Sequence, residues 1–462
     1  MKDLTEGNVF KHIVYFSVPM LLGNVFQQLY NVADSLIVGR FIGKEALAAV
    51  GASFPLLFIL TSLIIGLTMG MSVVISQYYG AKDIKKVTLA IDSMILFIIV
   101  SGIVVGLLGY FSCNYLFNLL SIPNDVIDGA TLYFKILIAG IIFMFAYNGI
   151  SSILRALGDS KTPLYFLIIS TFLNIILDIV FIVVFKWGIG AVAVATLISQ
   201  AVATLGLIVY INKKHTLIKI KFRNWLFDKS IFINSVKIGL PHGIQQSVVS
   251  LSMVLILSLV SSFGTDTLAG YSIALRIDAF AMMPIMTISL ALTSFVGQNI
   301  GAGRLDRVRS GYISALLLSI STSAILGVIF IFWGKFLSGF FTKDVEVISV
   351  SAQYLSTIGG FFVFLAGVFM TNGLMRGAGD SFVPMLLIVV SQVLVRVPVS
   401  YFFASDTFHL GSRGIWWGQP VAWIVGFVLT FFYYKSGRWK TKSVVVQPDV
   451  SKVESLSVLV DD

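Results

Sequence analysis

Charged residues and cysteine are scarce in this sequence. Only 12% of its 462 residues are Asp, Glu, Lys or Arg, about half of what a soluble domain carries. Hydrophobic residues make up 57%, and the mean hydropathy is +0.94. Most of the surface must therefore face lipid, and the composition excludes disordered, fibrous and disulfide-rich secreted proteins. The single cysteine, Cys113, has no partner within the chain for a disulfide.

The usual signals of soluble catalysis are also missing. The phosphate-binding pattern G-x-x-x-x-G-K-[ST] does not occur. No nucleophile, acid–base pair or set of metal ligands gathers at one membrane face, so no enzyme activity is predicted. A cleavable signal peptide is not expected, because the first apolar run is too long and lacks a cleavage site. The four histidines are too scattered for a metal site; they are His12, His215, His242 and His409.

Long apolar runs are what the sequence has in abundance. Each is long enough to cross a bilayer, which takes about 17–25 residues, and each is continuous rather than alternating, which excludes a barrel. Because lipid cannot satisfy an open backbone, each run is expected to be a helix. We predict an all-α membrane protein with twelve transmembrane helices. They lie near residues 13–38, 54–77, 89–111, 132–154, 163–185, 191–211, 238–263, 273–298, 312–333, 349–374, 383–403 and 415–434.

The distribution of Lys and Arg predicts the topology. If the N-terminus is cytoplasmic, the cytoplasmic segments hold 23 of the 32 basic residues and the opposite side holds 6. Basic residues favour the cytoplasmic side, so both termini are expected in the cytoplasm of a bacterial cell, with the chain in the cytoplasmic (inner) membrane. The net charge of +10 is then a topology signal, and no nucleic-acid partner is predicted.

The two halves of the sequence repeat each other. Residues 155–160 recur at 376–381, and the same offset of 221 maps Gln77 onto Gln298 and Pro163 onto Pro384. Each half has six expected helices, so the halves are parallel repeats related by a pseudo-two-fold axis along the membrane normal. We expect an N-terminal lobe at 1–212, a basic cytoplasmic linker at 213–236, a C-terminal lobe at 237–435 and a cytoplasmic tail at 436–462. Two such bundles suit alternating access, which makes a transporter the leading hypothesis.

Five motifs carry a family resemblance. They are the run from Pro19 to Gly39 with Tyr-Asn-Val-Ala-Asp-Ser at 30–35, the segments 77–83 and 298–303, and the segments 155–159 and 376–380. In order and spacing these resemble the multidrug and toxic compound extrusion (MATE) family over almost the whole chain. The resemblance implies two six-helix lobes arranged as a V and export of organic cations or other amphipathic compounds in antiport with H⁺ or Na⁺. It implies no cofactor besides the coupling ion, and we expect a monomer.

Polar residues inside the expected helices indicate a cation site. A charged side chain at bilayer depth is costly unless it faces a cavity or a partner. In the first helix the residues Asn24, Gln27, Asn31 and Asp34 form one stripe. Hydrogen bonds between helices could explain the amides, but they do not explain the carboxylate of Asp34. Further along, Asn174 and Asp178 are four residues apart and share a helix face, and Thr196 and Asn148 could converge with them.

All these side chains offer the oxygen ligands that a hard cation such as Na⁺ takes. The family resemblance implies a cation site at Asp34, Asn174, Asp178 and Thr196, and it matches Asn148 less closely. Two neighbouring buried carboxylates cannot both ionise cheaply, and a bound proton or Na⁺ would relieve their repulsion. The alternative is a buried polar network that only holds the bundle together.

The second half departs from one branch of the family. Relatives of the NorM type carry acidic residues in the seventh and tenth helices, where this chain has Gln245, Gln246, Thr371 and Asn372. The ion site is therefore expected in the first lobe alone, as in the DinF-like branch. For Arg276 and Asp278 in the eighth helix we expect a structural ion pair or an interfacial position. Arg396 could line the cleft or anchor helix packing.

The substrate cleft leaves a weaker sequence signal. Candidate lining residues are Gln27, Tyr30, Asn31, Tyr147, Gln245, Gln246, Phe280, Met283 and Arg396, because aromatic and Met side chains suit flat cations in an adaptable apolar cleft. A major-facilitator carrier fits poorly, since the loop at 80–86 lacks that family's glycines and arginines. A lipid or oligosaccharide flippase of the related superfamily is the alternative. Its cavity should be strongly cationic, whereas only Arg276 and Arg396 could supply charge here.

Overall fold

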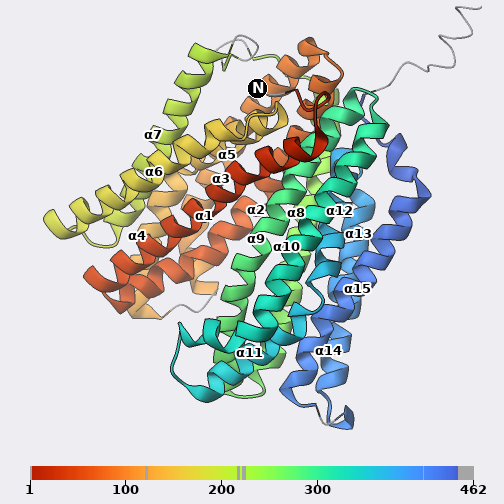
Figure 1. The fold of residues 1–462 in the computed structure, drawn as a ribbon. Coiled ribbons are helices and arrows are strands. Elements are labelled where there is room, and N and C mark those ends of the chain that lie inside the picture. Colours follow the sequence, from red (N-terminus) through yellow and green to blue (C-terminus); the bar gives the residue numbers. More distant parts are fainter. Residues whose placement is uncertain (1–2, 120–122, 216–218, 221–224, 409, 446–462) are drawn as a thin grey trace, which may run out of the picture.

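The computed structural model describes residues 3–119, 123–215, 219–220, 225–408 and 410–445, and they are almost entirely helical (Figure 1). Short π-helical stretches occupy Val180–Val184 and Val390–Val395, and 3₁₀ turns lie at Asp406–Phe408 and Arg438–Thr441. The α-helices are α1 (Val9–Phe41), α2 (Lys44–Gly80), α3 (Ile84–Leu119), α4 (Asn124–Ala139), α5 (Ile141–Ala156), α6 (Lys161–Ile179), α7 (Gly190–Lys214), α8 (Lys229–Ser261), α9 (Thr265–Gly301), α10 (Leu305–Gly339), α11 (Val345–Gly359), α12 (Phe362–Gly377), α13 (Phe382–Val389), α14 (Arg396–Ala404) and α15 (Ser412–Ser436).

The helices match the expected spans in number. In the described part of the chain, 10 spans are long and apolar enough to cross a membrane alone, and two bent helix pairs bring the number to as many as 12. The all-α membrane fold with twelve spans is therefore confirmed. The spans predicted at 132–154 and 349–374 are each built from two helices, because α4 and α5 meet at 49° and α11 and α12 meet at 57°. Hydropathy measures length and polarity and carries no information on such bends.

Helix starts follow local capping chemistry. Asn8 precedes α1 and accepts a hydrogen bond from the Lys11 amide, and Asp228 precedes α8 and accepts one from the Ile231 amide. Side-chain oxygens at this position satisfy amides that have no partner within the helix. The first helix of each half thus begins with the same device.

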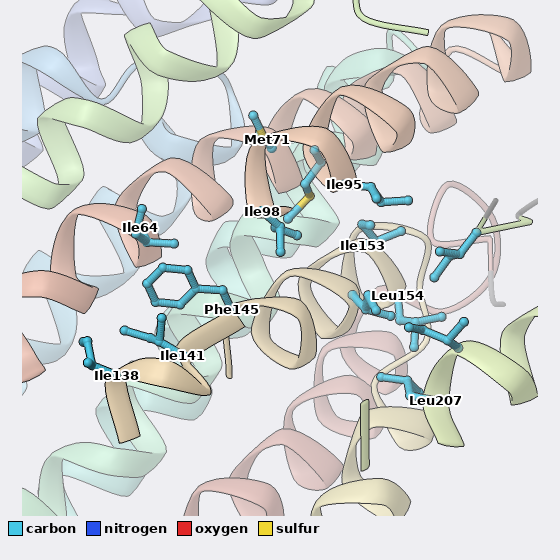
Figure 2. Packing of buried hydrophobic residues seen from close by; sticks show 14 of the residues in the cluster. Ile64, Met71, Ile95, Ile98, Ile138, Ile141, Phe145, Ile153, Leu154 and Leu207 are labelled. Atoms are coloured by element: carbon cyan, nitrogen blue, oxygen red, sulfur yellow. The ribbon is translucent and has the colours of Figure 1, made fainter. Parts of the chain in front are cut away.

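The helices form two sets, each with its own hydrophobic core. The core of the N-terminal set (α1–α7) begins at Val38 and also takes in Ile231 and Ile238 of α8. Figure 2 shows Ile64, Ile141 and Phe145 within it. The core of the C-terminal set (α8–α15) is built around Ile285, Phe362 and Trp416. Figure 1 shows the two sets close together at the end that carries the N-terminus and diverging toward the other end, as in a V. Contacts of α2 with α8 and α9, and of α1 and α5 with α9, join them.

The end where the sets meet, which we call the joined end, is held by two glutamines of the repeat. Gln77 at the end of α2 donates to the Gly377 carbonyl at 2.9 Å, and Gln298 at the end of α9 donates to the Ala156 carbonyl at 2.8 Å. A side chain on Gly80 or Gly301 would overlap the backbone carbonyl of the opposite glutamine. The motifs that reveal the repeat in the sequence therefore bridge the two sets in a symmetric way.

Both described chain ends close over these glutamines. The Leu4 amide donates to Gln298 Oε1 at 3.0 Å, and the Val444 amide donates to Gln77 Oε1 at 2.8 Å. Arg307 adds hydrogen bonds from its guanidinium to the carbonyls of Leu4, Glu6 and Gly7. The N-terminal segment thus bonds to the C-terminal helix set, and the C-terminal segment bonds to the N-terminal set. Both segments strengthen the joined end.

Candidate functional site

Two carboxyl groups face each other inside the N-terminal set. Asp34 on α1 is 7% exposed and Asp178 on α6 is 0% exposed. Their carboxyl groups interact electrostatically, and they come together because α1 packs along α6. Two acids at such close range can carry one negative charge far more easily than two.

Neutral oxygens complete the cluster. Asn174 lies one turn before Asp178 on α6 and is fully buried. Its amide nitrogen points to the hydroxyl of Thr196 on α7, at 3.5 Å, and the Tyr30 hydroxyl donates to the same Thr196 oxygen at 2.8 Å. Three of the helices predicted from the sequence thus contribute to one site.

The oxygens of this cluster are short of donors. Asp34 Oδ1, Asn174 Oδ1 and both carboxyl oxygens of Asp178 are buried without a hydrogen-bond donor in the described structure. Buried polar atoms are normally paired, and an orphaned set requires an explanation. Oxygen atoms with free lone pairs are the ligands that a proton or a hard cation takes. The donor set therefore fits Na⁺ or H⁺.

The structure adds two side chains that the sequence analysis did not select. Tyr133 on α4 is buried and interacts electrostatically with both Asp34 and Asp178. Gln200 on α7 has a buried side-chain oxygen without a partner. The repeat offset of 221 maps Tyr133 onto Tyr354, which lies near Asp278 and Arg396. The presence of Tyr at both equivalent positions is the sequence feature that could have selected Tyr133. Nothing in the sequence singled out Gln200.

A cavity of about 260 Å³ is bordered mainly by helices of the N-terminal set. A smaller one of about 30 Å³ shares Gln27, Tyr147 and Asn148 with it and is also lined by Tyr30, whose hydroxyl reaches Thr196. The larger cavity is formed by α1, α5 and α6 with one residue of α9. It is lined by Pro19, Met20, Gly23, Asn24, Gln27, Tyr147, Asn148, Ser151, Arg155, Ser160, Pro163, Leu164, Leu167 and Leu290.

Known proteins share both the sequence and this architecture. A sequence model of the MatE family matches residues 19–180 and 241–402, one match in each half. The chain belongs to the MATE transporter family. It is 34% identical to the probable multidrug resistance protein YpnP of Bacillus subtilis, over 96% of this chain and 99% of that protein. It is 32% identical to the probable multidrug resistance protein YoeA of the same organism, over 95% and 96%.

A solved MATE structure has the same fold. The outward-facing conformation of a multidrug resistance MATE family transporter superposes with a TM-score of 0.88 at 25% sequence identity, over 94% of this chain and 98% of that one. The twelve-helix MATE architecture is therefore shared from end to end.

The four polar residues predicted to form one stripe on the first helix lie in different environments. Asn24 donates to Thr287 on α9 at 2.9 Å and so links the two helix sets. Gln27 lines both cavities, whereas Asn31 is exposed and bonded to Gln28. Asn148 is exposed toward the cavities, and its amide donates to the Met144 carbonyl. Only Asp34 of the stripe enters the oxygen cluster.

The candidate residues of the C-terminal set lie apart from these two cavities. Gln245, Gln246, Phe280 and Met283 do not line either cavity, and Phe280 is exposed. Arg396 is 3% exposed and lies beside Tyr271 and Asp278, so it is enclosed among helices rather than open to a cleft.

Of the two roles expected for Arg276 and Asp278, an ion pair or an interfacial position, the described structure does not form the ion pair. Arg276 is exposed and Asp278 is buried, because residues two apart on a helix point in different directions. The ion pairs within the described residues are Lys86–Asp83 and Arg304–Asp306, both at the protein surface.

Proposed function

We propose that this MATE transporter exports organic cations or other amphipathic compounds from a bacterial cell in antiport with H⁺ or Na⁺. The observation that carries the proposal is the orphaned oxygen set of Asp34, Asn174 and Asp178. The relatives YpnP and YoeA, both called probable multidrug resistance proteins, support the export of drug-like compounds. No cofactor is required beyond the coupling ion, and the protein works as a monomer.

The topology proposed from the basic residues orients the V relative to the membrane. With both termini in the cytoplasm, the joined end faces the cytoplasm and the V opens away from the cell. The two helix sets are then an N-terminal lobe (1–212) and a C-terminal lobe (237–435) that rock against each other. The acid pair in the first lobe supports a DinF-like ion site.

Ion binding changes the relative populations of the conformations open to either side of the membrane. A proton or Na⁺ at Asp34 and Asp178 removes the repulsion between the carboxylates and favours the conformation in which the oxygens surround the ion best. Reversing a population from about 99:1 requires a difference in affinity of about 5.5 kcal/mol. A single change of charge in a water-poor site is of that order.

A flippase is less favoured. Such a protein needs a strongly cationic cavity for its substrate's phosphates, and the two cavities have one charged residue in their lining, Arg155.

The test is ion-driven efflux in inside-out vesicles. A sodium gradient and a pH gradient are imposed separately, with a fluorescent amphipathic compound that carries both an amine and a carboxylate as the transported probe. We expect Asp34→Asn to lose at least about 90% of the gradient-driven rate, because the amide cannot change charge with the ion. The matched control is Asp128→Asn, which removes an exposed carboxylate from the same helix set and should transport at the wild-type rate. Wild-type efflux by Asp34→Asn would refute the proposal.

A further inference from the structure

We propose that the larger cavity binds the carboxylate of an amphipathic substrate, with the guanidinium of Arg155 as its anchor. This inference rests on the proposed export function and narrows its substrate class to amphipathic acids and zwitterions. It concerns a residue that neither the ion site nor the joined end uses.

The charge of Arg155 has no counter-charge in the described structure. It is the one charged residue in the lining of the larger cavity. Its guanidinium donates to the Ser152 hydroxyl at 2.7 Å, whereas the two ion pairs of the described residues lie elsewhere. A guanidinium carries five N–H donors, and the Ser152 hydroxyl is the side-chain acceptor that the described structure provides for it. A partly buried cation without a counter-charge is costly, and an anionic ligand would supply one.

The equivalent arginine of the second repeat has a different environment. Arg376 is enclosed by two protein partners, His242 Nδ1 at 3.3 Å and the Ser289 hydroxyl at 3.2 Å. With the offset of 221, those two positions are Leu21 and Thr68 in the first repeat. A cation in the last turn of a helix is favourable to the helix itself, and this explanation covers both arginines. It does not explain why Arg155 borders a cavity.

The remaining lining suits a carboxylate with an apolar body. Ser151 lies one turn before Arg155 on the same face of α5, and its buried hydroxyl has no partner. Together the two residues offer a hydroxyl and a forked guanidinium, which is the geometry that binds carboxylates. Met20, Leu167 and Leu290 give the cavity apolar walls. A volume of about 260 Å³ has room for a bicyclic aromatic ring with a short acidic arm.

The acid group would not oppose the ion site. The negative carboxylates lie beyond Tyr30, which separates the smaller cavity from Thr196. A purely cationic compound, by contrast, would meet Arg155 and no carboxylate in this lining. Among the proposed substrates the cavity therefore favours those with an acidic group.

The test compares three naphthalene probes on the purified full chain. They are 1-naphthaleneacetate, the neutral 1-naphthaleneacetamide and the cationic (1-naphthylmethyl)trimethylammonium, with binding measured by equilibrium dialysis. We expect the wild type to bind the acid at least about tenfold tighter than the amide. Arg155→Gln should remove this preference and leave amide binding unchanged, and Arg155→Lys should keep part of it, because Lys retains the charge and loses the fork.

The control is Lys161→Gln, which removes an exposed cation near the start of α6 and should leave the preference intact. If Arg155→Gln does not fold, judged by size exclusion and amide binding, Ser151→Ala replaces it, with an expected loss of about fivefold in acid affinity. Equal binding of acid and amide by the wild type, tighter binding of the cation, or a preference that survives Arg155→Gln or Ser151→Ala would overturn the inference. The Asp34→Asn efflux experiment tests the proposed function separately, so either proposal can fail without the other.

Discussion

Tyr30 connects the ion cluster to the cavity through a single hydroxyl. It donates to Thr196 Oγ1 at 2.8 Å, and the same threonine oxygen is 3.5 Å from the Asn174 amide nitrogen. Because Tyr30 also lines the smaller cavity, its side chain contacts both that cavity and Thr196 of the proposed ion site. Under the proposed function, Tyr30 therefore links the ion site to the cavities.

Removal of this hydroxyl should weaken the ion site without unfolding the protein. In Tyr30→Phe the Thr196 hydroxyl loses its donor, and a hydrogen bond of this kind contributes about 1 kcal/mol. We expect the ion concentration for half-maximal efflux to rise about fivefold. The control Tyr165→Phe removes an exposed hydroxyl from α6 and should have no effect. An unchanged ion dependence in Tyr30→Phe would show that Thr196 does not need this donor.

At the scale of residues, spacing along the chain predicted which side chains share a helix face. It did not predict which side chains on different helices meet. Asn174 and Asp178 lie together because a helix brings residues four apart onto one face. Tyr133 comes from a different helix than either carboxylate, and its place depends on how α4 packs, which chain spacing does not express. Arg276 and Asp278 likewise form no ion pair in the described structure, because residues two apart on a helix point in different directions.

Among the helical elements, the bent pair α4–α5 is the feature that hydropathy did not predict. The pair changes direction by 49° at Gly140, and the corresponding pair α11–α12 bends by 57° near Gly360. Both breaks carry glycine, but their surroundings differ. A side chain on Gly140 would overlap Leu197 of α7, whereas Gly360 has open space around it.

The two glycines should therefore respond differently to the same substitution. Gly140→Ala forces Leu197 to move, and overpacking of this kind costs about 1–3 kcal/mol. We expect a clear drop in the thermal unfolding midpoint of the detergent-purified protein. Gly360→Ala is the matched control and should be neutral or slightly stabilising, because its backbone is helical. The double variant Gly140→Ala with Leu197→Ala should recover part of the loss. Equal midpoints for both single variants would contradict this packing.

At the scale of the whole molecule, the joined end is the main connection between the two helix sets. Gln77 and Gln298 each hold a carbonyl of the opposite set and an amide of a terminal segment. Such symmetric bonds favour the conformation in which this end is closed. Transport by alternating access requires that they break and form again in each cycle.

Loss of these glutamines should shift the conformational equilibrium. Each substitution removes hydrogen bonds worth about 1 kcal/mol apiece, so Gln77→Ala with Gln298→Ala should raise the population open at this end by about tenfold or more. The measurement is the spin-label distance between Lys85→Cys on α3 and Arg309→Cys on α10, in a Cys113→Ala background. Longer distances should appear in the double variant.

The control for this shift is Gln353→Ala. Gln353 bonds to Ser349 and Arg413 within the C-terminal set, so its loss should leave the distance distribution unchanged. A double glutamine variant with the wild-type distribution would show that the glutamines do not hold the end closed.

The sequence by itself determined the membrane location, the twelve helices, the duplication and the helix faces on which the acid and amide residues lie. These are consequences of solvent and of helix periodicity, which act locally along the chain. The tertiary structure decided which faces meet. The close approach of Asp34 and Asp178, the place of Tyr133, the cavity at Arg155 and the bonds of Gln77 and Gln298 all depend on contacts between segments far apart in sequence. Such contacts are fixed by the packing of whole helices against one another, and a pattern read along one helix does not contain them.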